Sequence, residues 1–210
     1  MRLVKLPTGK DGLMLRVCKG HFATSHSHIN YYIDMTMQKN RLSEARAVAQ
    51  ELCRDYKSTT IIDTILCLDG TEVIGACMAS ELTKDGYSNM NAHQTIYVVT
   101  PEHTSGSQLI FRENTAPMIS GKHVLILQAS VTTGYTAESA MEAVRYYGGY
   151  TVGMAAIFST LEEINGMKVT RIFDPGDLQD YSSWDARSCP LCKQGERINA
   201  LVNSHGFSSL

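Results

Sequence analysis

A run of hydroxyl side chains around a single glycine follows the apolar stretch at residues 124–127 and offers the clearest chemistry in the chain. Its members are Ser130, Thr132, Thr133, Gly134, Tyr135 and Thr136. Gly134 lets backbone N–H groups converge on a ligand because it carries no Cβ. A helix expected to begin near Ala137 adds the partial positive charge of its N-terminus. The pattern predicts a site for a phosphate monoester without lysine or arginine, although an ordinary threonine-capped turn between a strand and a helix has the same spacing.

The elements expected around this run alternate between strand and helix. Short runs of branched apolar residues predict strands at 61–68, 95–100, 124–128, 151–158 and 168–173. Helical spacing predicts helices at 45–53, with Ser43 as N-cap, at 73–82 and at 138–147. Such alternation favours an α/β fold with a mainly parallel sheet of about five strands, covered by helices on both faces. Ligands of such a sheet collect beyond the carboxyl ends of its strands.

Both ends of the chain are expected to lie outside this core. Residues 3–7 and 13–17 flank a glycine-containing turn at 8–12, which predicts an N-terminal β-hairpin. Residues 102–121 show no clean periodicity, and long loops in compact domains are usually functional or disordered, so we expect a mobile loop there. The prediction is one domain over 1–210, with a hairpin and hood segment at 1–34, a core at 43–173 and a tail at 174–210.

Composition narrows the class of protein. The 210 residues are 43% apolar and 19% charged, which suffices for a buried core. A net charge of −2 gives no general attraction for nucleic acid or an anionic membrane, so neither is an expected partner. No apolar stretch approaches the roughly 18–20 residues that span a bilayer, and the N-terminus has no signal-peptide pattern. Four cysteines scattered through expected core segments fit a reducing compartment, so we expect a cytoplasmic protein.

Residues 124–136 resemble the phosphoribosyl-diphosphate signature of type I phosphoribosyltransferases, in which four apolar residues, two acids and two apolar residues precede Thr-Thr-Gly-x-Thr. The resemblance extends over most of the chain and points to the orotate phosphoribosyltransferases within that family. It implies the family's fold, a central parallel sheet flanked by helices with a small hood built from both termini. It also implies transfer of 5-phosphoribose between diphosphate and a nucleobase, phosphoribosyl diphosphate or a nucleoside monophosphate as ligand, Mg²⁺ as cofactor, and a homodimer.

The resemblance also suggests roles for two further groups of residues. It assigns His28, Tyr31 and Tyr32 to the base pocket, and Asp69, Gly70, Thr71 and Glu72 to the diphosphate loop.

The chain departs from the family at three functional places. Gln128 and Ala129 replace the two acids that hold the ribose hydroxyls, and losing one such electrostatic contact typically costs on the order of 10²–10³ in rate. The carboxylates of 69–72, in place of a more glycine-rich run, would hold a diphosphate only through Mg²⁺. Where orotate enzymes have a loop lysine, 100–108 contain neither Lys nor Arg, which leaves His103 as a weak candidate for acid–base catalysis. A non-catalytic regulatory protein that binds nucleotides or phosphoribosyl diphosphate on the same fold is therefore the alternative function.

Cys189 and Cys192 have zinc-knuckle spacing, and their segment is similar to the tail of some family members. One pair supplies two of the four ligands of a structural Zn²⁺ site, and His205 or Cys18 could complete it, including across a dimer. A reduced surface pair is the plainer interpretation, and a disulfide is a third. The histidines at 21, 26 and 28 are likewise interpreted as ordinary surface residues of a polar loop, with a base pocket or a metal as the alternatives.

Overall fold

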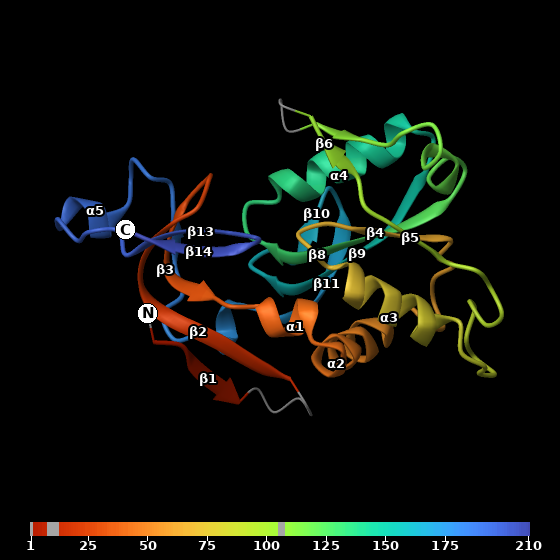
Figure 1. Cartoon of the computed structure of the whole chain (residues 1–210), viewed down its shortest axis with the longest axis horizontal. Helices are drawn as coiled ribbons and strands as arrows, with labels where there is room; N and C mark the ends of the chain where they lie inside the picture. The colour runs from red at the N-terminus through yellow and green to blue at the C-terminus, as the bar shows by residue number, and fades with distance from the viewer. Residues whose placement is uncertain (1, 8–12, 105–107) are drawn as a thin grey trace.

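The computed structural model describes residues 2–7, 13–104 and 108–210 and is built around two six-stranded sheets (Figure 1). One of them, here called the core sheet, has the order β10-β11-β9-β8-β4-β5. Its strands are β4 (Thr64–Cys67), β5 (Tyr97–Val99), β8 (His123–Val131), β9 (Tyr150–Ser159), β10 (Glu163–Ile164) and β11 (Met167–Phe173). Every pair is parallel except β10 with β11. The predicted parallel sheet is therefore confirmed, with an antiparallel strand added at one edge.

Helices cover both faces of the core sheet, because its strands are apolar on both sides. α2 (Leu42–Cys53) and α3 (Glu72–Leu82) pack on one face, and α4 (Tyr135–Tyr146) packs on the other (Figure 1). In β8, Leu125 and Leu127 join the apolar cluster under α2 and α3, whereas Val124 and Ile126 join the cluster under α4. This division follows from the two-residue period of a strand.

The apolar face predicted for the helix at 45–53 is confirmed, since Ala45, Val48, Ala49, Leu52 and Cys53 are the buried residues of α2. The predicted N-cap is wrong. α2 begins at Leu42 with Arg41 as N-cap, so Ser43 lies inside the first turn. The reason is a short preceding helix, α1 (Thr36–Asn40), which leaves Arg41 as the one extended residue between two helices.

Both termini build the second sheet, here called the hood. Its strands are β1 (Val4–Pro7), β2 (Met14–Ala23), β3 (His28–Ile33), β12 (Ser183–Trp184), β13 (Ala200–Asn203) and β14 (Gly206–Ser209). β1 and β2 form the predicted antiparallel hairpin, whose turn at 8–12 lies outside the described residues. β13 runs parallel to β2, so the tail lies beside the N-terminal strands (Figure 1). The hood predicted from both termini is confirmed.

The segment at 102–121 is more regular than predicted. β6 (Glu102–His103) pairs antiparallel with β7 (Leu109–Ile110), and a 3₁₀ turn, η1 (Ala116–Met118), follows. Strands this short leave no alternating pattern in a sequence. The centre of the segment, 105–107, lies outside the described residues. None of the helices in the described ranges has the length and apolar character needed to cross a bilayer.

Candidate functional site

A pocket of about 340 Å³ lies between the carboxyl ends of the core strands and the hood. Its core wall is formed by residues 128–137, which run from the end of β8 into α4, and by Asp69 after β4. Its hood wall includes Tyr31 and Tyr32 of β3 and the β13–β14 turn, with Val202, Asn203, Ser204 and Gly206. All six residues of the candidate phosphate-binding run line this pocket, which lies where a parallel sheet is expected to bind ligands.

The phosphate-binding run forms the turn between β8 and α4. β8 continues to Val131, three residues further than predicted, and α4 begins at Tyr135. Gly134 is the N-cap of α4 at a φ of 86°, a left-handed conformation that favours glycine. No side chain in the described ranges caps this helix. Its first N–H groups therefore remain available for an anion, as predicted for a phosphate cradle.

Thr160, which follows β9, stabilises this turn through two hydrogen bonds. Thr160 donates its hydroxyl to the backbone oxygen of Thr132 at 2.7 Å and its N–H to that of Val131 at 2.9 Å. These two bonds fix the last strand residue and the first turn residue, so the direction of the turn does not depend on a ligand.

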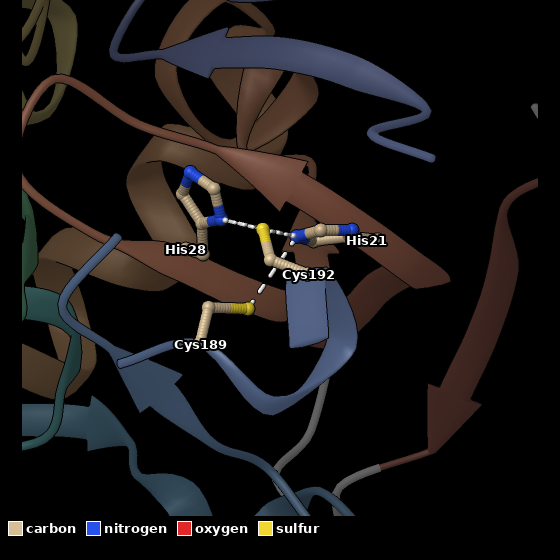
Figure 2. A group of neighbouring side chains, drawn as sticks. All are labelled: His21, His28, Cys189 and Cys192. Carbon is tan, nitrogen blue, oxygen red and sulfur yellow. Dashed lines mark hydrogen bonds between the residues drawn. The ribbon is translucent and has the colours of Figure 1, made fainter. Parts of the chain in front are cut away.

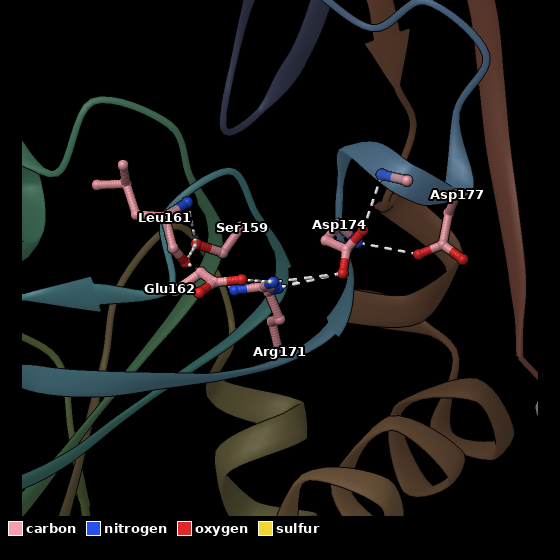
Figure 3. Close-up of polar contacts among 7 residues, drawn as sticks. Ser159, Leu161, Glu162, Arg171, Asp174 and Asp177 are labelled. Carbon is pink, nitrogen blue, oxygen red and sulfur yellow. Dashed lines mark hydrogen bonds and ion pairs between the residues drawn. The ribbon is translucent and has the colours of Figure 1, made fainter.

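Arg171 supports the same region from β11 (Figure 3). Its guanidinium donates to the backbone oxygen of Leu161 at 3.2 Å and forms ion pairs with Glu162 at 3.1 Å and Asp174 at 3.4 Å. Leu161 in turn packs against the turn, because a Cβ built on Gly134 would lie 3.2 Å from its side chain. Arg171 therefore holds the residue that limits the space behind Gly134.

Asp69 reaches the pocket from a turn in which it and Gly70 both have positive φ, 59° and 74°. Lys39 of α1 also lines the pocket and is 7% exposed. Its ammonium donates to the backbone oxygen of Asp69 at 2.7 Å and to the backbone oxygen of Ser204. Lys39 thus joins a core turn to a hood turn. Sequence patterns gave no signal for Lys39, since its partners are 30 and 165 residues away in the chain.

Burial shifts the pKa of both ionisable groups at this corner. It raises the pKa of Asp69, against the opposing effects of the Lys39 charge and of hydrogen bonds from the Ala129 N–H and the Gln128 side chain. Burial lowers the pKa of Lys39, against nearby carboxylates that raise it, of which Asp69 has the largest effect.

The chain is similar to orotate phosphoribosyltransferases in both sequence and fold. It is 27% identical over 192 residues to the orotate phosphoribosyltransferase of Wolinella succinogenes, which covers 85% of this chain and 87% of that protein. Its fold matches Leishmania donovani UMP synthase with a TM-score of 0.56 at 19% identity, over 77% of this chain but only 34% of that longer one. It also matches Mycobacterium tuberculosis orotate phosphoribosyltransferase, solved in complex with 5-phospho-α-D-ribosyl 1-diphosphate, with a TM-score of 0.52 at 17% identity, over 70% of this chain and 83% of that one. No protein-family model matches the chain.

The chain has the type I phosphoribosyltransferase fold. Its sequence likeness is to the orotate phosphoribosyltransferases.

Gln128 and Ala129, which replace the acids of the phosphoribosyltransferase signature, both line the pocket. Gln128 is 2% exposed, and its Oε1 is a buried oxygen without a hydrogen-bond partner among the described residues. Leaving such an acceptor unsatisfied costs roughly 1–3 kcal/mol. A hydroxyl donor on a bound ligand would remove that cost, whereas the side chain of Ala129 has no polar atom to offer.

Of the four residues assigned to the diphosphate loop, one lines the pocket and three do not. Asp69 lines the pocket, and Gly70, Thr71 and Glu72 are not among its described lining residues. Thr71 is fully buried and donates its hydroxyl to the backbone oxygen of Leu68 at 2.7 Å, which gives it a structural role. Glu72 begins α3 and lies within 3.3 Å of the Thr100 hydroxyl. Only Asp69 of this group is placed to contact a ligand in the pocket.

Two of the three residues assigned to the base pocket line the pocket. Tyr31 and Tyr32 line the pocket, as do His103 of β6 and His26. His28 is not among the described lining residues and lies instead beside His21, with 3.0 Å between His28 Nδ1 and His21 Nε2. The interpretation of His21 and His28 as surface residues is wrong, because they are 1% and 9% exposed. Both lie on strands of the hood within runs of buried residues, His21 near the end of β2 and His28 at the start of β3.

Cys189 and Cys192 meet these two histidines (Figure 2). The four side chains point toward one another from β2, β3 and the tail around α5 (Pro190–Lys193). One nitrogen or sulfur atom of each lies within 4.8 Å of the others. Neither His205 nor Cys18 belongs to this group, so the completion predicted within one chain is wrong, and a completion across a dimer stays a prediction. All six cysteines are free, which contradicts the disulfide interpretation. Cys189 is fully buried and Cys192 is exposed, so the surface-pair interpretation is wrong for Cys189 alone.

Proposed function

We propose that this protein transfers 5-phosphoribose between diphosphate and a nucleobase, as an enzyme of nucleotide synthesis or salvage that resembles orotate phosphoribosyltransferase. The observation that carries the proposal is the helix start at Gly134, which no side chain of the described residues caps, inside a pocket that also holds the Gln128 oxygen, which has no partner among them. The 5′-phosphate would bind the turn, and a ribose hydroxyl would donate to Gln128. Tyr31 and Tyr32 would then contact the base, since every base has a π-face.

The residues present fit the Mg²⁺ ion that the resemblance implies. Asp69 is the one acidic side chain among the described residues that line the pocket. Mg²⁺ is commonly bound through one or two carboxylates together with the phosphates of a substrate. Asp69 would hold the ion, which would neutralise charge on the diphosphate. The chain's own residues bind the 5′-phosphate and orient the ribose, and His103 is proposed to hold or move a proton.

The proposal extends to a homodimer in the cytoplasm. Six unpaired cysteines support a reducing compartment. His103 lines the pocket of its own chain, so this histidine reaches the site without a partner subunit.

A turnover assay tests the function directly. The purified protein is incubated with Mg²⁺, phosphoribosyl diphosphate and orotate, uracil or xanthine, and release of diphosphate and formation of nucleotide are measured. Calorimetry with nucleoside monophosphates is run on the same preparation. We expect turnover with at least one base. Tight binding of a monophosphate without turnover of any base would contradict transfer and support the non-catalytic alternative, which the transferase name of the curated relative does not favour.

A further inference from the structure

The cluster of His21, His28, Cys189 and Cys192 has the donor set of a structural metal site. Two imidazole nitrogens and two sulfurs in tetrahedral arrangement are typical of zinc. His21 and His28 lie seven residues apart on β2 and β3, whereas Cys192 is 164 residues from His28 in the chain. We propose that the four residues bind a Zn²⁺ ion that fastens the C-terminal tail to strands β2 and β3.

The distances between donor atoms fit the edges of a tetrahedron around zinc. Bonds of roughly 2.0–2.1 Å to nitrogen and 2.3 Å to sulfur give edges of about 3.3 Å between nitrogens and about 3.6 Å between nitrogen and sulfur. His21 Nε2 lies 3.0 Å from His28 Nδ1 and 3.5 Å from Cys189 Sγ. Cys192 Sγ lies 3.7 Å from His21 Nε2 and 3.3 Å from His28 Nδ1. Four of the six edges therefore lie within a few tenths of an ångström of these values, and the two others, from Cys189 Sγ to Cys192 Sγ and to His28 Nδ1, are no longer than 4.8 Å.

A hydrogen bond outside the cluster orients His21 for this role. His21 Nδ1 lies 3.0 Å from the backbone oxygen of Glu196, which can only accept, so the proton is on Nδ1. Nε2 then carries a lone pair that faces His28 and both cysteines. A carbonyl that receives the second N–H of a ligating histidine is a usual companion of zinc sites. One lone pair can accept a hydrogen bond from few neighbours, whereas a cation at the centre satisfies all four donor atoms.

The turn that carries the cysteines is shaped to present both of them. Gly195, at a φ of 77°, donates its N–H to the backbone oxygen of Cys192 at 3.0 Å, and Glu196 donates to that of Leu191 at 2.9 Å. This closed turn places Cys189 and Cys192 on the cluster. It also returns the Glu196 carbonyl to His21. The same short segment therefore supplies two ligands and the group that orients a third.

The site lies next to the point where the tail joins β2. The N–H of Asn199 donates to the backbone oxygen of His21 at 2.7 Å, and the Asn199 side-chain oxygen accepts from the His21 N–H at 2.7 Å. β13 begins at the next residue and leads to Ser204, which binds Lys39. The ion would thus fix the start of the strand that carries one wall of the pocket.

Metal analysis of the intact chain tests the site without reference to activity. The protein is reduced, loaded with Zn²⁺ and dialysed, and its metal content is measured; we expect about one zinc per chain. Replacement with Co²⁺ should give the visible bands of a tetrahedral thiolate complex. In Cys192→Ser, metal affinity should fall by at least roughly tenfold, since even the loss of an outer hydrogen-bond partner costs that much. Cys77→Ser is the matched control, because Cys77 lies on α3 outside the cluster, and it should retain the metal.

Hydrogen exchange provides a second measurement, which holds even if a variant folds poorly. Removing zinc from the wild-type chain with a chelator should speed exchange in 199–203 and leave the strands of the core sheet unchanged. Absence of bound zinc in the loaded wild type, or equal zinc in wild type and Cys192→Ser, would overturn the proposal. Iron in place of zinc would also overturn it. None of these outcomes depends on phosphoribosyl transfer.

Discussion

The ammonium group of Lys39 lies 2.7 Å from the backbone oxygen of Asp69 and also donates to the backbone oxygen of Ser204. One buried cation thereby joins the turn after β4 to the β13–β14 turn, on opposite sides of the pocket. Lys39→Met keeps most of the apolar stem and removes every donor. We expect the free energy of unfolding to fall by about 1.5–3 kcal/mol, the usual range for hydrogen bonds to a charged group. Affinity for a nucleoside monophosphate should fall as well, because both walls lose their connection.

A second lysine supplies the control for this variant. Lys57 forms an ion pair with Glu81 at 2.6 Å, but its side chain is 37% exposed. Exposed pairs contribute less than about 1 kcal/mol, so Lys57→Met should change stability little and nucleotide affinity not at all. Urea denaturation and calorimetry measure the two quantities. Equal losses in both variants would show that Lys39 has no special part in the pocket.

Alanine variants of Gly134 and Gly166 distinguish the cost of backbone strain from a direct effect on ligand binding. Both glycines have positive φ, 86° and 78°, and Gly166 has open space where a Cβ would be added. Alanine in a left-handed conformation costs roughly 1–2 kcal/mol at either position. Only Gly134→Ala should weaken phosphate binding, because the added Cβ would lie 3.2 Å from the Leu161 side chain inside the turn that would hold the phosphate, and one of the two must move by a few tenths of an ångström.

Calorimetric titration of the two alanine variants with a nucleoside monophosphate measures this difference. We expect a loss of roughly tenfold or more for Gly134→Ala, equivalent to about 1.4 kcal/mol, and none for Gly166→Ala. If both variants bind as the wild type does, the phosphate site lies elsewhere.

Local periodicity was enough to predict the parts of the fold that depend on neighbours in the chain. The buried face of α2 follows directly from its helical spacing, and the two faces of β8 follow from its alternation. The phosphate turn was visible for the same reason, since strand, turn and helix are consecutive. Where two local patterns overlap, the sequence predicts the wrong start of a helix. Ser43 is a good N-cap by type, yet the short helix before Arg41 moved the start of α2.

Contacts between distant segments leave no such pattern. His21 and Cys189 are 168 residues apart, and Lys39 and Ser204 are 165 apart. The spacing of Cys189 and Cys192 suggested a metal site, but the hood sheet, which brings β2 and β3 against the tail, selects the histidines. The strand order of the hood would have been needed to predict His21, rather than His205 or Cys18, as a member of this group.

Restoring the acids of the family signature should increase the rate of transfer. Gln128 and Ala129 both line the pocket, so the double variant Gln128→Glu, Ala129→Asp would place two carboxylates beside the ribose. Negative charge that faces a developing positive charge is typically worth on the order of 10²–10³ in rate per contact. We expect kcat/KM for phosphoribosyl diphosphate and the best base to be higher than in the wild type.

Thermal denaturation must accompany that measurement, because Ala129 is only 4% exposed. The single variant Gln128→Leu serves as the opposite case. It removes the unpartnered oxygen, so nucleotide affinity should fall without an increase in rate. A folded double variant no faster than wild type would mean that these two positions do not face the ribose.

The pH dependence of Mg²⁺-assisted binding should report on Asp69. Burial raises the pKa of this carboxyl group, although Lys39 and hydrogen bonds from Ala129 and Gln128 oppose the shift. A protonated carboxyl group does not bind Mg²⁺, so Mg²⁺-dependent affinity for phosphoribosyl diphosphate should decrease as the pH falls through the raised pKa. The decrease should therefore begin at a higher pH than for an ordinary aspartate, whose pKa is about 3.9. Titrations with and without Mg²⁺ at a series of pH values measure the part of the affinity for phosphoribosyl diphosphate that depends on Mg²⁺. Asp69→Asn should abolish that part. A Mg²⁺-dependent component that persists in Asp69→Asn would assign the ion to other groups.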